Sequence, residues 1–189
     1  SKLALLSLKC QSSSNEDSIY SEGEQLRCHD VEESLDVCFP GTCNGEFNLS
    51  MLYGKVTWIE LTASWWSTCY NDLQDADHII VDYMHNPDVF IMTILMDEYQ
   101  PWNCNQWAAA GNADIPVIVS GGTSIGFGGS GDFESLFYSE GGIPKRVFID
   151  HELCVHSIHH GYMTDAEIKN KINEMLELKE NSLWKKYYI

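Results

Sequence analysis

A cysteine beside the expected start of a helix is the first candidate for chemistry in this chain. Cys69 closes the stretch 55–69, KVTWIELTASWWSTC, whose first half is rich in β-branched and aromatic residues, as a buried strand is. Apolar residues then recur every three or four positions over 67–85, which predicts a helix. A helix N-terminus lowers the pKa of a nearby thiol, and the thiolate attacks disulfides. The stretch therefore indicates thiol chemistry or a structural thiol at Cys69.

Glu60 is an acid in a place where burial is expected. The strand predicted over 56–62 carries apolar side chains on both faces, which is typical of a central strand covered on both sides. A buried carboxyl needs a partner, and burial raises its pKa. Glu60 is either a proton acceptor or an acid held by a hydrogen bond. We favour the structural role, because no nucleophile stands beside it.

Disulfides are expected in the N-terminal part of the chain. Seven cysteines are present, four of them within the first 43 residues, and no C-x-x-C pair occurs. A loop-rich, cysteine-rich segment is typical of proteins from an oxidising compartment. The connectivity stays open, and the odd count leaves at least one thiol. The candidates for pairing are Cys10, Cys28, Cys38, Cys43, Cys69 and Cys104.

Cys69 itself has three readings. It is a buried structural thiol, a reactive single thiol, or one half of a disulfide. We favour a disulfide with Cys104, because loops at the carboxyl ends of neighbouring parallel strands gather at one edge of a sheet. Cys104 follows the second predicted strand, 89–96, and so belongs to that edge.

A weaker cluster of metal-type side chains lies near the C-terminal hairpin. Cys154 and His156 share a face of the strand expected over 153–158, and His159 and His160 follow it. Sulfur and imidazole together suit copper or zinc. A hairpin surface that happens to carry histidines is the favoured reading, so no metal and no cofactor are predicted.

Charge excludes one class of partner. The net charge is −17, and no basic stripe exists that could displace counterions from a phosphate backbone, so no nucleic acid is expected.

No apolar run reaches the length of a transmembrane helix. Asn48, in Asn48-Leu49-Ser50, is a glycosylation site if the source is eukaryotic.

The order of the expected elements indicates an α/β fold. From residue 55 strands alternate with helices, and the chain closes with a hairpin and a final helix that begins with a capping box at Thr164. On the helix over 67–85, Asp72 and Asp77 are expected on the outer face. Residues 1–49 are predicted to be a cysteine-rich extension and 50–189 the domain proper.

Three local matches give the chain a resemblance to the thioredoxin-like superfamily, most of all to its extracytoplasmic TlpA/ResA-like and redoxin group. Ala63-Ser-Trp-Trp-Ser-Thr-Cys69 is similar to the A-x-W-C-x-x-C motif of that family. Ile143-Pro144 resembles its cis-proline, and Glu60 stands where its buried acid stands. Cys69 matches the second cysteine of the motif, and Trp66 occupies the position of the first.

The resemblance implies a thioredoxin-like sandwich with a mixed central sheet flanked by helices. It also implies that Cys69, Glu60 and Pro144 would be the catalytic residues if the protein were redox-active. An indole cannot attack a disulfide, so the substitution at Trp66 removes the nucleophile.

The sequence therefore predicts an extracytoplasmic, non-enzymatic protein. Its expected role is a structural or protein-binding module, self-association included, since tryptophans 65, 66, 102 and 107 are placed to cluster at one edge. The first alternative is a thiol-disulfide oxidoreductase that uses Cys69 with Cys104. The second is a copper or zinc carrier.

Overall fold

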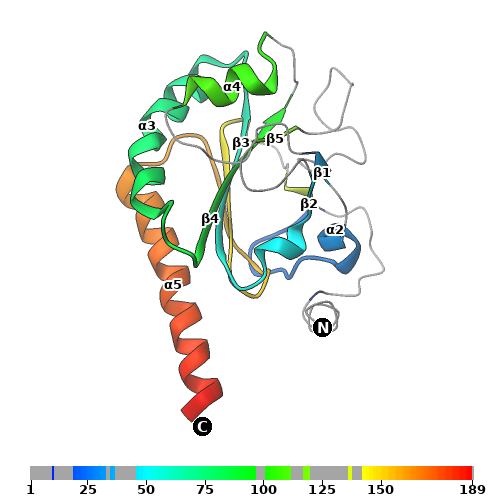
Figure 1. Ribbon diagram of the computed structural model, residues 1–189, viewed down its shortest axis with the longest axis vertical. Helices are drawn as coiled ribbons and strands as arrows, with labels where there is room; N and C mark the ends of the chain where they lie inside the picture. The colour runs from blue at the N-terminus through cyan, green and yellow to red at the C-terminus, as the bar shows by residue number, and fades with distance from the viewer. Residues whose placement is uncertain are drawn as a thin grey trace.

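The computed structural model describes residues 10, 19–32, 35–36, 46–96, 101–111, 117–119, 136–137 and 142–188 (Figure 1). Its centre is a five-stranded mixed sheet of order β5-β4-β3-β6-β7. The strands are β3 (Val56–Ala63), β4 (Val89–Met96), β5 (Val117–Val119), β6 (Lys145–Ile149) and β7 (Val155–His160). The first three run parallel, and β6 and β7 are antiparallel to their neighbours. The predicted α/β fold with a mixed sheet is confirmed.

Two long helices cover one face of the sheet (Figure 1). They are α3 (Ser67–Tyr83) and α5 (Asp165–Tyr188). Trp58 of β3 stacks on Phe148 of β6 under these helices, with ring centroids 6.5 Å apart. The predicted capping box opens α5, because the Thr164 hydroxyl and backbone amide both donate to the Glu167 carboxylate. The helical periodicity of both segments thus reflects their packing on the sheet.

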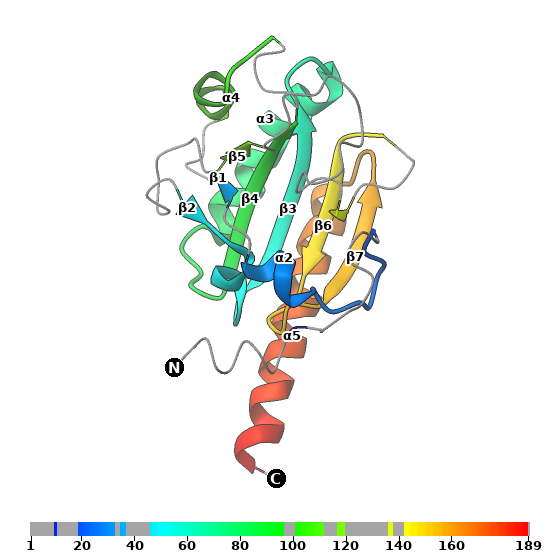
Figure 2. The ribbon, with the colours of Figure 1, turned by 90° about the vertical axis from the view of Figure 1, so that its right-hand side faces the viewer.

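The N-terminal residues cover the opposite face (Figure 2). Their short elements are α2 (Cys28–Glu32), β1 (Leu35–Asp36), β2 (Glu46–Phe47) and the 3-10 helix η1 (Leu49–Leu52). Their buried apolar side chains belong to the same core cluster as Ile59 and Leu61 of the sheet. The division of the chain at residue 49 stays a prediction, and residues on both sides of it share one core.

A segment of the N-terminal part lies along the edge strand β7. The Gly23 amide donates to the Val155 carbonyl over 2.7 Å, and the Val155 amide donates to the Glu24 carbonyl over 2.8 Å. The Leu26 amide continues the pattern by donating a hydrogen bond of 2.9 Å to the Leu153 carbonyl. An open sheet edge invites pairing with other chains, so this segment protects β7.

A disulfide and a buried polar group fix the same segment. Cys10 is bonded to Cys28, which settles one of the open pairings. Arg27 lies over the Tyr20 ring, 4.3 Å from its centroid, and its Nε is 2.8 Å from Asp30 Oδ2. The Tyr20 hydroxyl also donates to Asp30, and burial raises the pKa of Tyr20. These charged and polar side chains are buried because they satisfy one another.

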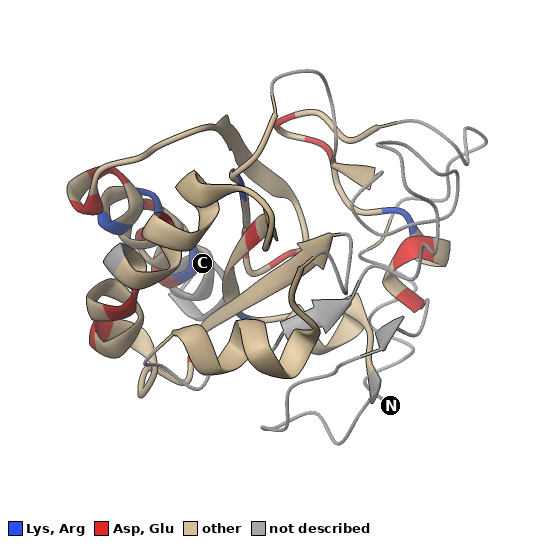
Figure 3. Cartoon of the chain, turned by 90° about the horizontal axis from the view of Figure 1, so that it is seen from above, with Lys and Arg blue, Asp and Glu red and all other residues tan. Residues whose placement is uncertain are grey.

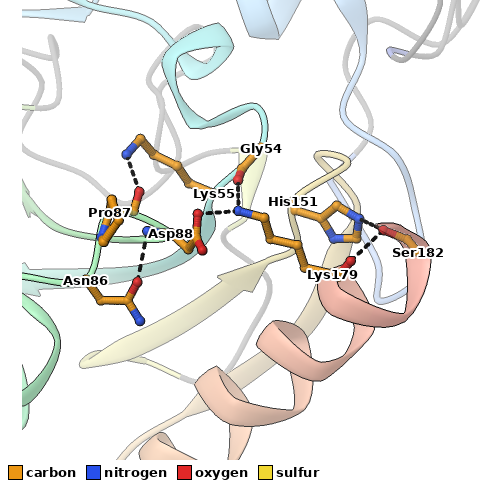
Figure 4. Close-up of polar contacts among 8 residues, drawn as sticks. All are labelled: Gly54, Lys55, Asn86, Pro87, Asp88, His151, Lys179 and Ser182. Atoms are coloured by element: carbon orange, nitrogen blue, oxygen red, sulfur yellow. Dashed lines mark hydrogen bonds and ion pairs between the residues drawn. The ribbon is translucent and has the colours of Figure 1, made fainter. Parts of the chain in front are cut away.

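The C-terminal half of α5 is attached to the opposite end of the sheet from α4 (Cys104–Ala110) (Figures 1 and 4). Lys179 Nζ lies 2.7 Å from the Gly54 carbonyl and 2.5 Å from Asp88 Oδ1. His151 contacts Ser182 Oγ at 2.9 Å. Beyond these contacts the helix projects past the sheet (Figure 1). Among the described residues, no helix combines the length and apolar character needed to cross a bilayer.

Removing the Cys10–Cys28 bond tests how far the N-terminal part stabilises the whole fold. The bond closes a loop with a sequence separation of 18 residues, so the double substitution Cys10→Ser/Cys28→Ser should lower the free energy of unfolding by about 3 kcal/mol. Urea denaturation under non-reducing conditions measures this change. Cys154→Ser, which removes a thiol outside any disulfide, is the control. Equal stability of the double variant and the unchanged protein would show that the disulfide does not stabilise the fold.

Candidate functional site

The candidate site lies where β3 ends and α3 begins, at the end of the sheet near α4 (Figures 1 and 2). Between them, the Trp66 amide donates to the Ala63 carbonyl over 3.3 Å and so closes a turn. The turn presents Trp65 and Trp66 to solvent, with 38% and 45% of their surfaces exposed. The predicted succession of strand, loop and helix is confirmed.

Cys69 lies in the first turn of α3 and is fully buried, with 0% of its surface exposed. Burial raises the pKa of this thiol, against the opposing effects of hydrogen bonds from the Thr62 side chain and the Ala63 backbone. The negative charges of Glu60 and Asp72 raise it further. Burial at this helix N-terminus therefore favours the thiol over the thiolate.

The predicted Cys69–Cys104 disulfide is wrong. Cys69 is a thiol, whereas Cys104 is disulfide-bonded elsewhere. Both side chains belong to one buried cluster with Trp107, as expected for loops that meet at one edge, but the Cys69 thiol interacts with Thr62 and Ala63 instead. Cys38 and Cys43 lie outside the described residues.

A buried arginine links the sheet to α3 below Cys69. Arg146 Nη2 lies 2.7 Å from Asp72 Oδ2, and its Nη1 donates to the Gly161 carbonyl over 2.5 Å. Its Nε lies 3.8 Å from Glu60 Oε2. The side chains of all three ionic residues are less than a tenth exposed. Glu60 is thus buried as predicted, and its neighbours are an arginine and a second acid.

Burial is the main reason why the pKa of Glu60 rises to about 7. The positive charge of Arg146 opposes this shift, and the negative charge of Asp72 adds to it. The Arg146 guanidinium stabilises the charge of Asp72 more than the charge of Glu60, because its contact with Asp72 is the shorter of the two. Glu60 therefore titrates in the neutral range, where a proton acceptor could act.

Sequence reasoning missed this arrangement in two ways. Asp72 and Asp77 were expected on the outer face of α3, but both are buried. Positions 69, 72, 73 and 76 follow the inner-face spacing, which could have placed Asp72 beside Cys69. Arg146 went unnoticed, although a charged residue directly before an apolar run of a strand needs a partner if it is buried.

Pro144 lies next to the buried cluster that contains Cys69. The Ile143–Pro144 peptide bond is cis, as the resemblance implied. Ile143 packs against the cluster that contains Cys69, and the Pro144 carbonyl accepts a hydrogen bond of 2.8 Å from the Gly161 amide. The fold thus brings together Cys69, Glu60 and the cis-proline, the three residues that would be catalytic if the protein were redox-active.

Aromatic side chains gather around this site. Trp65 and Trp66 make an edge-to-face contact with centroids 5.6 Å apart. Trp102 packs against the buried Trp107 at 5.9 Å, and against Tyr70 of α3 at 5.4 Å. The Trp102 amide donates to Ser64 Oγ over 3.2 Å, which joins the loop before α4 to the loop before α3. The predicted tryptophan cluster therefore exists as two groups, Trp65 with Trp66 on the loop before α3, and Trp102 with Trp107 on the loop before α4 and on α4 itself.

The metal-type side chains of the hairpin have other contacts. His156 lies 3.3 Å from Glu174, and His159 lies 3.0 Å from the Tyr162 carbonyl. Within the described ranges, no group of three or more potential ligands is arranged to hold a metal ion. Cys154 and His156 stay weak candidates.

Asn48 precedes η1, and the Ser50 hydroxyl donates to its side-chain oxygen. Glycosylation at Asn48 stays a prediction.

Comparisons with known proteins support the fold. No family model matches the chain, and no curated protein matches it. Solved structures do: the exposed lipoprotein thioredoxin of Streptococcus pneumoniae is 22% identical, with a TM-score of 0.56, and the match covers 75% of this chain and 98% of that one.

Two further structures agree. A secreted disulfide oxidoreductase of Mycobacterium tuberculosis, homologous to DsbE of E. coli, is 12% identical with a TM-score of 0.57, covering 78% of this chain and 98% of that one. A thiol:disulfide interchange protein of Chlorobium tepidum is 17% identical with a TM-score of 0.55, covering 76% and 95%. The chain therefore has the thioredoxin-like fold.

The pKa of Glu60 predicts a pH-dependent stability. The folded state holds this proton up to about pH 7, whereas the unfolded chain loses it near 4.5, so stability falls as the pH rises through this interval. Glu60→Gln should raise the free energy of unfolding by about 2–3 kcal/mol at pH 8, because it removes the buried charge, and should have almost no effect near pH 4.5.

Chemical denaturation of both proteins between pH 4.5 and 8 measures this difference. Glu177→Gln, on the exposed surface of α5, is the matched control and should change little at either pH. If the two proteins differed in free energy of unfolding by the same amount at both pH values, the raised pKa of Glu60 would be contradicted.

Proposed function

We propose that this chain is an extracytoplasmic protein of the thioredoxin-like fold that binds a protein partner at the edge carrying Trp65 and Trp66, and that it does not exchange disulfides there. The observation that carries the proposal is the pair Trp66 and Cys69. An exposed indole stands three residues before a fully buried thiol.

Exchange within a C-x-x-C motif needs an accessible thiolate that attacks and a second thiol that resolves the mixed disulfide. Trp66 supplies no sulfur. Cys69 has no exposed surface, and burial raises the pKa of its thiol, so both access and thiolate fraction are low at neutral pH. Neither position meets the first requirement.

The surface suits recognition instead. Large exposed aromatic side chains supply much of the energy of protein–protein contacts, because each buries a wide apolar area at little entropic cost. Trp65 and Trp66 are held by the turn after β3, and the bond from Trp102 to Ser64 fixes the adjoining loop. A rigid aromatic surface loses little entropy on binding.

The covalent cross-links support an oxidising location. Cys10 is bonded to Cys28, and Cys104 is also in a disulfide. Disulfides persist outside the cytosol and are rare inside it. Two of the similar proteins are described as secreted or exposed, which agrees with this location.

The oxidoreductase alternative that joined Cys69 to Cys104 loses its basis, because the two are not bonded to each other.

Restoring the missing sulfur tests the proposal directly. The substitution Trp66→Cys places a thiol on the exposed turn, three residues before Cys69, and should raise catalysis of insulin reduction by dithiothreitol at least about tenfold above the unchanged protein. Trp65→Cys is the matched control: it gives an equally accessible thiol with the wrong spacing and should have little activity. A clear activity of the unchanged protein that Cys69→Ser abolishes would falsify the proposal.

Alkylation rates test the inaccessibility of Cys69 independently. Brief treatment of the folded protein with iodoacetamide, followed by peptide mass analysis, should modify the half-buried Cys154 and leave Cys69 intact. Both should react after unfolding in urea. Rapid modification of Cys69 in the folded protein would instead support a reactive single thiol.

A further inference from the structure

Charge is absent from the described part of the edge that carries the two exposed tryptophans. Three segments meet there, 61–71, 101–111 and 142–144, and none contains Asp, Glu, Lys or Arg. The charged residues that directly flank these segments, Glu60, Asp72 and Lys145, are buried. Figure 3 looks down on this end of the molecule, where α4 and the start of α3 are tan.

Neutral polar and aromatic groups take the place of charges. In the same segments, Asn71 of α3 and Asn105 of α4 are exposed amides. Gln106 is exposed too, and its side chain caps α4 together with Asn103. An amide carries both donors and an acceptor, so a surface of this kind can bond to an identical surface.

The rest of the molecule works against self-association. Each copy has a net charge of −17, so two copies repel each other wherever acidic surfaces meet. In a two-fold symmetric contact the same patch faces itself, so a patch that carries mostly one sign of charge repels its copy, whereas a neutral patch does not. Among the described surfaces, the neutral aromatic edge satisfies this condition.

We infer that the partner bound at this edge is a second copy of the same chain. The inference rests on the proposed function, since it assigns a partner to the proposed binding surface. Trp66 is the central contact, because it is the more exposed of the two indoles. The neighbouring amides complete the contact. The association is opposed by the net charge of both copies, so it tightens when salt screens that repulsion.

Sedimentation velocity of the full chain between about 1 and 200 μM tests the inference at low and at moderate ionic strength. The expected result is a rise from the mass of one chain to that of two with increasing concentration, shifted to lower concentration by salt. Trp66→Ala should weaken the association at least about tenfold. Met84→Ala, an equally exposed apolar residue at the far end of α3, should leave it unchanged.

A charge introduced at the edge gives a second test with a matched control. Asn105→Asp keeps the shape of the side chain but places two like charges in the contact, so it should weaken the dimer at low salt and recover in part at higher salt. Asn170→Asp adds the same charge on the exposed side of α5 and should have a much smaller effect.

Two outcomes would overturn the inference. One is the mass of a single chain at every concentration in both salts. The other is equal association of Trp66→Ala and the unchanged protein. Both outcomes are independent of the insulin assay on Trp66→Cys. If the protein stays monomeric and Trp66→Cys gains activity, self-association is refuted and the proposed function stands.

Discussion

The contact between Arg146 and Asp72 determines how the candidate site is built. Arg146 comes from β6 and Asp72 from the inner face of α3, so their 2.7 Å bond fixes the helix at a set height above that strand. A buried charge without a partner is strongly destabilising, which makes this pairing a firm constraint. The position of α3 in turn decides that Cys69 is enclosed and that Trp66, one residue before the helix, faces solvent. Glu60 is left with the longer contact to Arg146 and keeps a raised pKa.

A second constraint comes from the N-terminal part. Its residues fill the face of the sheet that α3 and α5 leave uncovered, and its backbone occupies the edge of β7. A sheet with one open face would expose a wide apolar surface to water. The disulfide at Cys28 and the polar group around Asp30 hold this cover in place. In its described contacts the N-terminal part therefore packs into the core beside the sheet and against the edge of β7.

Periodicity was enough to predict β3, α3, β4 and the burial of Glu60, because each depends on local alternation of apolar and polar residues. The cis-proline followed from a motif. That Cys69 is a thiol and not half of a disulfide could not be predicted in this way, since proximity at one edge does not decide which sulfurs face each other. Asp72 was misplaced because acidic residues were assigned to the outer face by type, although their spacing put them inside. Arg146 is the reason why Asp72 can be buried, and a partnership between residues 74 positions apart leaves no periodic signal.

The attachment of α5 gives the molecule two distinct ends. Lys179 fixes the helix near the loops that precede β3 and β4, and Ser182 contacts His151 in the turn between β6 and β7. The last turns of the helix project away from the tryptophan edge (Figures 1 and 4). A helix of 24 residues is about 36 Å long. In a pair of chains joined through the tryptophan edge, the two projecting helices would point in opposite directions. Such a pair would hold the ends of its two C-terminal helices apart by the length of both molecules.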